Sequence, residues 1–307
     1  MVGETPREIP PTERSSPIFR LFPGEHSLRR TAKLAMRIAV LTYHSQNVTG
    51  NDYVDNDHVA LHHDIEQVLK AGICVVSLRQ IADALLGKSS LPSRAVAFSC
   101  DDGTDLDFRD IHWPHLGLQQ SFATIVRRFA TKYPMNRFGP ITSFVIADPE
   151  ARRELDSRCL KGLGWMSEDW WQPAVASGIF HIGIHGWDHC HPMLERYSAT
   201  TRPDNGRPDI SSYQDAEMQV LQAVSYISAR APNPGTALFA FPFGVSSEYL
   251  VREYLPNFQA EHKLTAAFST EPAIIHGESN RWSLPRYVCG YHWKNPEDLS
   301  ALLRSLK

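Results

Sequence analysis

The sequence has no long apolar run and no marked excess of charge of either sign. None of its apolar stretches approaches the roughly 20 residues that a membrane-spanning helix requires. The 307 residues carry a formal net charge of −3. Basic residues occur only as scattered pairs such as Arg127 and Arg128, without a basic stripe. We therefore predict neither a transmembrane segment nor a nucleic-acid-binding surface.

Cysteine is scarce, and a secretory signal is not apparent. The five cysteines are odd in number, lie far apart and include no Cys-x-x-Cys pair: Cys74, Cys100, Cys159, Cys190 and Cys289. Such usage predicts neither a disulfide framework nor a cysteine-rich zinc site. Residues 1–30 are rich in proline, glutamate, arginine and serine and lack the uninterrupted apolar segment of a signal peptide. We expect a polar leader over residues 1–30 and a cytoplasmic protein.

From about residue 36, short apolar runs alternate with longer amphipathic segments. The runs predict strands at 37–43, 73–77, 95–99, 141–147, 180–184, 237–241 and 264–269. Helical spacing is seen around residues 61–69, and further helices are expected at 119–132, 149–158, 167–177 and 212–230. This alternation predicts a parallel sheet with helical crossovers, either an open doubly wound sheet or a barrel.

Seven or eight strand candidates favour an α/β fold of the distorted (β/α)7-barrel type, with residues 31–307 as a single domain. Two polar or proline-rich segments, 104–117 and 196–212, interrupt the alternation and are expected to be surface insertions. In such folds the chemistry lies in loops at the carboxyl ends of the strands. Candidate functional residues are therefore sought where the predicted strands end.

The run FHIGIHGWDHCHP places four histidines at the end of one predicted strand. His185 and His189 are four residues apart, so both can reach one ion if the chain turns helical after the strand. Two imidazoles and one carboxylate form a metal site that keeps a coordination position open for water or substrate. We interpret His181 as a core histidine, and His191 as a substitute ligand if the turn is looser.

The run AVAFSCDDG ends another predicted strand with two adjacent carboxylates, Asp101 and Asp102. An Asp-Gly pair after a strand is most often a simple turn. If the histidines lie nearby, however, one carboxylate can complete the metal site. The other can remain ionised beside the cation and take a proton from the attacking water. The residue pattern alone does not say which aspartate does which.

These motifs resemble those of the polysaccharide deacetylases, the NodB-homology or carbohydrate esterase family 4 group. Ser99–Gly103 is similar to the family motif T-F-D-D-G, and His185–His189 is similar to H-S/T-x-x-H. The resemblance implies that Asp101 is the catalytic base and that Asp102, His185 and His189 bind the metal. The run FAFPFG at 239–244 is similar to the third motif, R-x-P-Y-G, which shapes the substrate groove.

The segment Leu41-Thr42-Tyr43-His44, at the end of a predicted strand, is similar to the N-terminal segment of a permuted branch of the family. That branch processes poly-N-acetylglucosamine. That similarity implies His44 as the general acid; His276 and His292 are the alternatives. The chain departs from the family pattern at three places. Cys100 replaces a phenylalanine, Gly186 replaces a serine or threonine, and Ala240 stands where an arginine orients the base. Arg286 could supply the missing arginine or have a structural role at the surface.

The resemblance implies a metal-dependent N-deacetylase that hydrolyses the amide of an N-acetylated amino sugar. We expect one divalent ion, Zn²⁺ or else Co²⁺, Ni²⁺ or Mn²⁺. The residues expected to contact the carbohydrate are Trp187, Pro242, Phe243 and Arg286, with Trp113 as a further aromatic candidate. The alternatives are hydrolysis of another non-peptide C–N bond in a small amide or imide, and a non-catalytic carbohydrate-binding role. The oligomeric state is left open.

Overall fold

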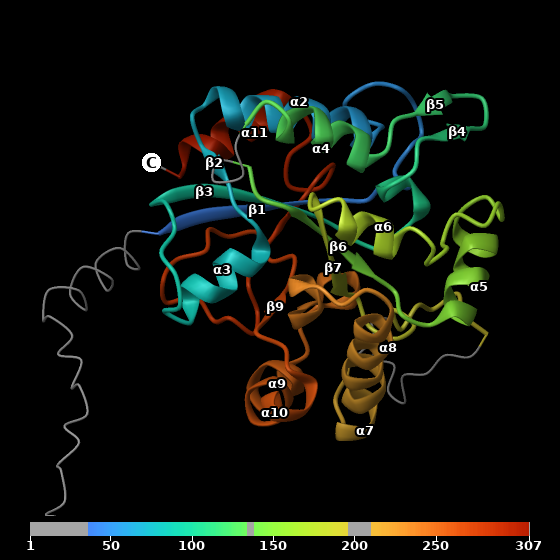
Figure 1. Cartoon of the computed structure of the whole chain (residues 1–307), viewed down its shortest axis with the longest axis vertical. Helices are drawn as coiled ribbons and strands as arrows, with labels where there is room; N and C mark the ends of the chain where they lie inside the picture. Colours follow the sequence, from blue (N-terminus) through green and yellow to red (C-terminus); the bar gives the residue numbers. More distant parts are fainter. Residues whose placement is uncertain (1–35, 134–137, 196–209, 307) are drawn as a thin grey trace, which may run out of the picture.

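A parallel β-sheet crosses the centre of the molecule in the computed structural model (Figure 1), which describes residues 36–133, 138–195 and 210–306. The leader predicted at 1–30 and most of the insertion predicted at 196–212 lie outside these residues. The sheet contains β1 (Arg37–Tyr43), β2 (Cys74–Val75), β3 (Arg94–Cys100), β6 (Ile141–Val145), β7 (Phe180–Ile184), β8 (Leu238–Ala240), β9 (Ala266–Phe268) and β10 (Tyr287–Val288).

The strands follow the order β10-β1-β3-β6-β7-β8-β9, and every pair in the series is parallel. The short strand β2 pairs with the start of β3, on the edge where β6 pairs with the end of β3. Leu284 bridges Phe268 of β9, and shortly afterwards Tyr287 and Val288 pair with β1. Segment 284–288 thus joins β9 and β10, the two ends of the series, and the sheet closes into a distorted barrel. The barrel predicted from the sequence is confirmed.

Alternate strand residues face opposite sides of the sheet, because side chains alternate along a strand. Ile38 and Val40 of β1 join an apolar cluster with residues of β3, β8 and β9, inside the barrel. Their neighbours in β1, Leu41 and Tyr43, join the larger cluster between the strands and the surrounding helices. The strands are therefore buried on both faces, as expected for a parallel sheet covered by helices.

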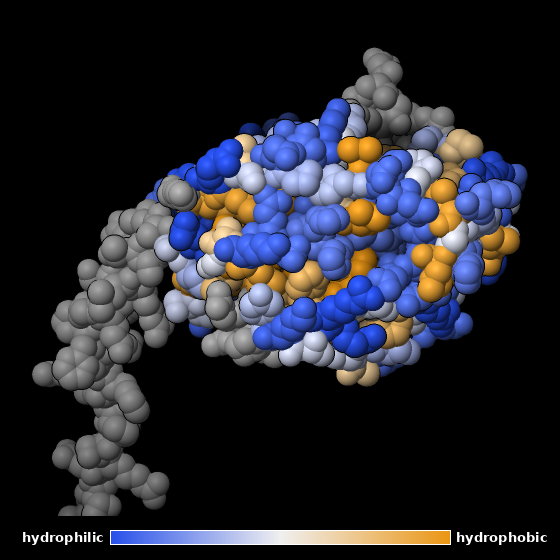
Figure 2. Space-filling view, turned by 90° about the horizontal axis from the view of Figure 1, so that it is seen from above, coloured by the Kyte–Doolittle hydropathy of each residue, from blue (hydrophilic) through white to orange (hydrophobic). Residues whose placement is uncertain are grey.

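Helices cover the outside of the barrel (Figure 1). The longer ones are α2 (Asp57–Lys70), α3 (Leu78–Leu85), α4 (Phe122–Ala130), α5 (Pro149–Cys159), α8 (Ala223–Arg230) and α11 (Pro296–Arg304). The shorter ones are α6 (Trp171–Ala176), α7 (Tyr213–Ala216), α9 (Leu255–Asn257) and α10 (Gln259–His262). Helices α2, α4 and α11 lie side by side, and the surface above them is mainly hydrophilic with separate apolar groups (Figure 2). None of the described helices has both the length and the apolar character needed to cross a bilayer.

Helix starts follow the sequence chemistry. Asn56 caps α2 by accepting hydrogen bonds from backbone N–H groups of the first turn, and Asp148 caps α5, which begins with Pro149. The helix predicted at 212–230 is α7, a π-helical stretch at Glu217–Gln222 and α8 in succession. The bounds predicted for β1 and β7 are those observed.

The segment 104–117 differs in part from a surface insertion. It contains a 3₁₀ turn at Asp105–Asp107 and the strand β4 (Ile111–Trp113), which forms an antiparallel hairpin with β5 (Gly117–Gln119). Residues 104–107 are buried. Their burial is possible because their polar groups are hydrogen-bonded within the molecule: Asp107 accepts from Ser45 and Ser143, and Asp105 from Ser167.

Candidate metal centre

A cavity of about 820 Å³ opens at the carboxyl ends of the strands. Loops that follow β1, β3, β6, β7, β8, β9 and β10 all contribute to its lining. Most of the sequence-predicted site residues meet here: His44, Asp101, Asp102, His185, His189, His191, Phe243 and His292. The placement agrees with the general position of ligand sites in barrels.

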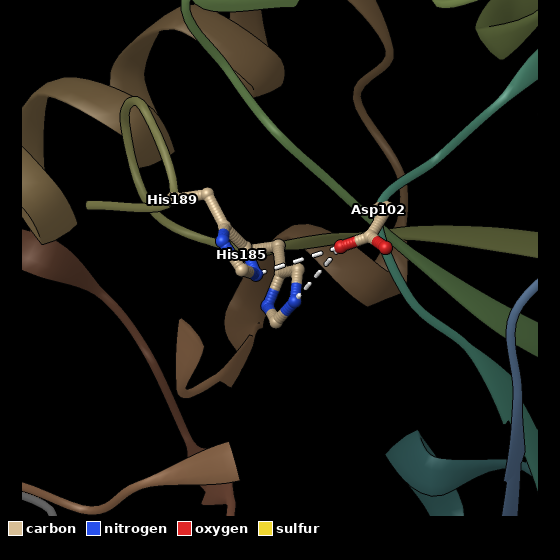
Figure 3. A group of neighbouring side chains, drawn as sticks. All are labelled: Asp102, His185 and His189. Carbon is tan, nitrogen blue, oxygen red and sulfur yellow. Dashed lines mark ion pairs between the residues drawn. The ribbon is translucent and has the colours of Figure 1, made fainter. Parts of the chain in front are cut away.

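Asp102, His185 and His189 point toward one another (Figure 3). Oδ1 of Asp102 lies 3.6 Å from Nε2 of His185 and 3.5 Å from Nε2 of His189. Among the described residues, this is the group of acidic, histidine and cysteine side chains whose ligand atoms lie close enough to share an ion. The separations suit an ion about 2.0–2.2 Å from each ligand atom. The donor set fits a divalent metal, with coordination positions left for water or substrate.

The tautomer of His185 is fixed by its second nitrogen. Nδ1 of His185 donates a hydrogen bond to the carbonyl oxygen of Ala240 at 2.9 Å, and Nε2 is the ring nitrogen that faces Asp102. His189 is kept neutral, because burial and the nearby His185 lower its pKa to about 3. Neutral imidazoles are the form that binds a metal ion.

The backbone of the two metal-bearing loops is left-handed at several residues. Asp102 has φ 73° and is followed by Gly103 with φ 72°, where a Cβ atom would lie 2.5 Å from Cγ1 of Val145. Glycine is therefore required at position 103 both for conformation and for space. His189 likewise has φ 62°. Non-glycine residues held in this region are uncommon, and they concentrate at functional sites.

The loop between the two histidines is held by groups that the sequence motifs do not include. Gln219, in the π-helical stretch, accepts a hydrogen bond from the backbone N–H of Trp187 at 3.0 Å and donates to Asp188 at 2.8 Å. Asp188 also accepts from the backbone N–H of Cys190 at 2.9 Å. These bonds fix the loop at Gly186, where the family motif has serine or threonine. A glutamine in a helix far along the chain gives no sequence signal for this role.

Asp101 is paired with Arg286. The guanidinium donates two parallel hydrogen bonds, from Nη1 to Oδ1 at 2.7 Å and from Nη2 to Oδ2 at 2.8 Å. Arg286 is fully buried, and its Nε donates to the carbonyl oxygen of Ser269. Burial raises the pKa of Asp101, but the Arg286 guanidinium, together with the nearby His185, outweighs burial and lowers this pKa to well below its usual range. Of the two roles left open for Arg286, the structure places it against Asp101 and not at the surface.

Asp102 also remains ionised. Burial raises its pKa, and the nearby His189, His44 and His185 outweigh that effect and lower it below the ordinary value. Its second oxygen accepts a hydrogen bond from the side chain of Gln46. Two carboxylates thus face the same cavity, one turned to an arginine and the other to two imidazoles.

A third carboxyl group lies deeper. Asp107 is fully buried and accepts hydrogen bonds of 2.5 Å from both Ser45 and Ser143. Burial raises the pKa of Asp107 to about 7. The thiol of Cys100, which stands where the family motif has phenylalanine, donates to the same carboxyl group at 3.4 Å. This network holds the turn that follows Asp101 and Asp102.

The candidate acids differ in position. His44 follows β1 and lines the cavity; its backbone N–H donates to Asp57 at 2.7 Å, and its Nδ1 is buried without a hydrogen-bond partner. His292 also lines the cavity, and its Nδ1 accepts from the backbone N–H of Val288 at 2.7 Å. His276 is exposed and is not among the lining residues.

The residues expected to contact carbohydrate are not all on the cavity wall. Phe243 lines it with its ring 4.4 Å from that of His189, centroid to centroid. Trp187, Pro242 and Arg286 are not among the lining residues. Trp187 packs its ring edge-on against Tyr226, and Trp113 is buried against Trp165. Both indole rings pack against other aromatic rings, and neither is among the residues that line the cavity.

His181 and His191 differ in their position relative to the cavity. His181 lies early in β7, half-buried and away from the cavity lining, and its interpretation as a core histidine stays a prediction. His191 lines the cavity beside His189, with 5.7 Å between ring centroids, but is not part of the triad.

No protein-family model and no curated protein matches this chain. Solved structures do match it. The structure of IcaB from Ammonifex degensii is 17% identical, with a TM-score of 0.59 over 88% of this chain and 97% of that chain. The deacetylase PplD of Streptococcus pyogenes is 14% identical, with a TM-score of 0.58 over 89% and 99%. The deacetylase domain of BpsB from Bordetella bronchiseptica is 15% identical, with a TM-score of 0.57 over 83% and 96%. These likenesses show that the chain has the fold of polysaccharide deacetylases.

Proposed function

We propose that this chain is a metal-dependent hydrolase that removes the acetyl group from an N-acetylated amino sugar, giving a free amine and acetate. The observation that carries the proposal is the convergence of Asp102, His185 and His189 beside Asp101 in one cavity. The shared fold with solved deacetylases supports the same conclusion.

Asp102, His185 and His189 would hold the ion, as the resemblance in sequence implies. A divalent cation bound there supplies Lewis-acid chemistry to the amide carbonyl and to an attacking water. The donor set of two imidazoles and one carboxylate suits Zn²⁺, and Co²⁺, Ni²⁺ and Mn²⁺ accept the same ligands.

In this proposal Asp101 is the general base. Its carboxylate is ionised at neutral pH, and Arg286 fixes both of its oxygens, so that its orientation is set before substrate binds. It takes a proton from the attacking water. His44, from a neighbouring strand end, gives a proton to the departing amine nitrogen; this role, and the permuted branch that implies it, belong to the proposal.

Ala240 in place of the orienting arginine would favour a non-catalytic carbohydrate-binding protein. Arg286, just before β10, removes this reason because it forms the ion pair with Asp101. The other alternative, hydrolysis of a C–N bond in a small amide or imide, would use the same site residues. It differs from the proposal only in the substrate that the cavity accepts.

The test is acetate release by the purified full chain from N-acetylglucosamine and its oligomers. We expect release to stop when a chelator strips the metal and to return when Zn²⁺ or Co²⁺ is added back. Release of ammonia from small amides or imides, without acetate from any N-acetylated sugar, would replace the proposed substrate class. Activity that persists at full rate after complete removal of metal would contradict the proposal.

A further inference from the structure

One side of the cavity is apolar. Five residues on or near α5 form what we call the apolar wall: Ile146, Leu155, Cys159, Leu160 and Met166. Four residues on the loops after β9 and β10 form the polar wall: Thr270, Glu271, Tyr291 and His292. Both walls line the same cavity as the Asp102, His185 and His189 triad.

The order of the strands places the two walls opposite one another. The apolar wall follows β6, which is three strands away from β9 in one direction and three from β10 in the other. Strand β6 also lies directly between β3, which leads to Asp102, and β7, which leads to His185. The apolar wall therefore adjoins the triad itself.

The apolar wall is fixed to the loop that carries Asp102. The backbone N–H of Asp105 donates to the carbonyl oxygen of Trp165 at 2.7 Å, and the carboxylate of Asp105 accepts from Ser167 at 2.9 Å. From the other side, buried Arg152 of α5 donates to the carbonyl oxygen of Met166 at 3.1 Å. The loop after α5 is thus tied both to the helix and to the metal-bearing turn, so the wall is preorganised.

We propose that the apolar wall binds the acyl chain of the substrate, and that the preferred substrate is an amino sugar whose N-acyl chain is longer than acetyl. This inference rests on the proposed function, because it places the amide carbonyl at the triad. The sugar hydroxyls then face the polar wall and the alkyl chain faces α5. The methyl of an acetyl group is too small to cover a wall of five side chains. Each further buried methylene is expected to raise kcat/KM about fourfold, the factor that corresponds to about 0.8 kcal/mol.

The first experiment compares N-acetyl-, N-butyryl- and N-hexanoylglucosamine, with released amine as the readout. We expect kcat/KM for the butyryl compound to exceed that for the acetyl compound by about 15-fold if both added methylenes are buried. We expect the hexanoyl compound to be at least as good as the butyryl compound. A kcat/KM that stays level or falls from acetyl to butyryl overturns the inference and leaves the proposed deacetylase intact.

A pair of variants on α5 tests the wall itself. Cys159→Phe adds bulk at an exposed residue that lines the cavity, and Ser157→Phe adds the same bulk at an exposed residue of the same helix outside the lining. We expect Cys159→Phe to lower the ratio of hexanoyl to acetyl kcat/KM at least tenfold, and Ser157→Phe to leave it unchanged. If both variants leave the ratio unchanged, the acyl chain does not lie on this wall.

Calorimetric binding of the product carboxylates tests the inference without turnover. The metal-loaded full chain is titrated with acetate and with hexanoate. Binding of hexanoate at least tenfold tighter than acetate supports the acyl site, and equal or weaker binding overturns it. If none of the amides is cleaved, the proposed function fails, and the carboxylate titration still decides whether the wall is an acyl-binding surface.

Discussion

Replacing Arg286 by glutamine removes the positive charge beneath Asp101. The arginine is fully buried and makes two charge-assisted hydrogen bonds, of 2.7 and 2.8 Å, to the carboxylate. Glutamine is neutral and too short to replace both bonds. Asp101 would then be a buried carboxylate without a counter-charge, and breaking such a pair costs about 3–5 kcal/mol. We expect the free energy of unfolding at pH 7 to fall by that amount.

The loss should depend on pH in a definite direction. With Arg286 present, the folded-state pKa of Asp101 is depressed. The ion pair therefore contributes stability above the ordinary pKa of about 3.9, and this is lost only as the pH falls through the lower folded-state value. Without Arg286, burial raises the pKa of Asp101, and protonation relieves the unpaired charge as the pH falls. The deficit should be full at pH 7 and smaller at pH 4.

Urea unfolding followed by tryptophan fluorescence at both pH values gives the two free energies. A chelator is included, because ion binding adds its own stabilisation. Arg281→Gln is the matched control: Arg281 is partly buried, and its hydrogen bonds go to the carbonyl oxygen of Thr265 and the side chain of Gln259. The reasoning is refuted if Arg286→Gln is as stable as the parent at pH 7, or if its deficit grows toward pH 4.

Four other substitutions test the proposed roles. Asp101→Asn should lower kcat about 10²- to 10⁴-fold, as expected for loss of a general base, while metal content by atomic emission is retained; loss of the metal would mean that the two aspartates are reversed. His185→Ala and His189→Ala should each strip the metal on dialysis, and zinc retained in both would refute the triad. His44→Ala should lower kcat about 10²- to 10⁴-fold; an unchanged rate would make His292 the next acid to test by the same assay.

Much of the fold, and the position of the metal-binding residues in it, could be predicted from the local sequence pattern. The apolar runs that became β1 and β7 are each followed by a histidine, His44 and His185, and both strands have the predicted limits. The placement of Asp102, His185 and His189 at one edge follows from the rule that parallel strands present their carboxyl ends together. Their convergence therefore needed only the correct strand assignment.

The contacts that hold the site residues in place could not be predicted from local sequence pattern. Arg286 and Asp101 are 185 residues apart, and they meet only because segment 284–288 closes the barrel next to β1. Gln219 holds the His185–His189 loop from a π-helical stretch whose position has no sequence signal. Trp187 packs against Tyr226, 39 residues further along the chain by number, and a local residue pattern does not specify this contact. Each of these depends on tertiary contacts between distant segments.

The pairing of Asp101 with Arg286 also bears on the order in which the molecule can be assembled during synthesis. Asp101 leaves the ribosome long before Arg286, and until segment 284–288 is available, β1 lacks its β10 neighbour and the carboxylate lacks its cation. The nascent chain must keep Asp101 in water during this interval, because an unpaired charge is costly to bury. The ion pair at the base of the site is therefore completed only after segment 284–288 has been synthesised and has paired with β1.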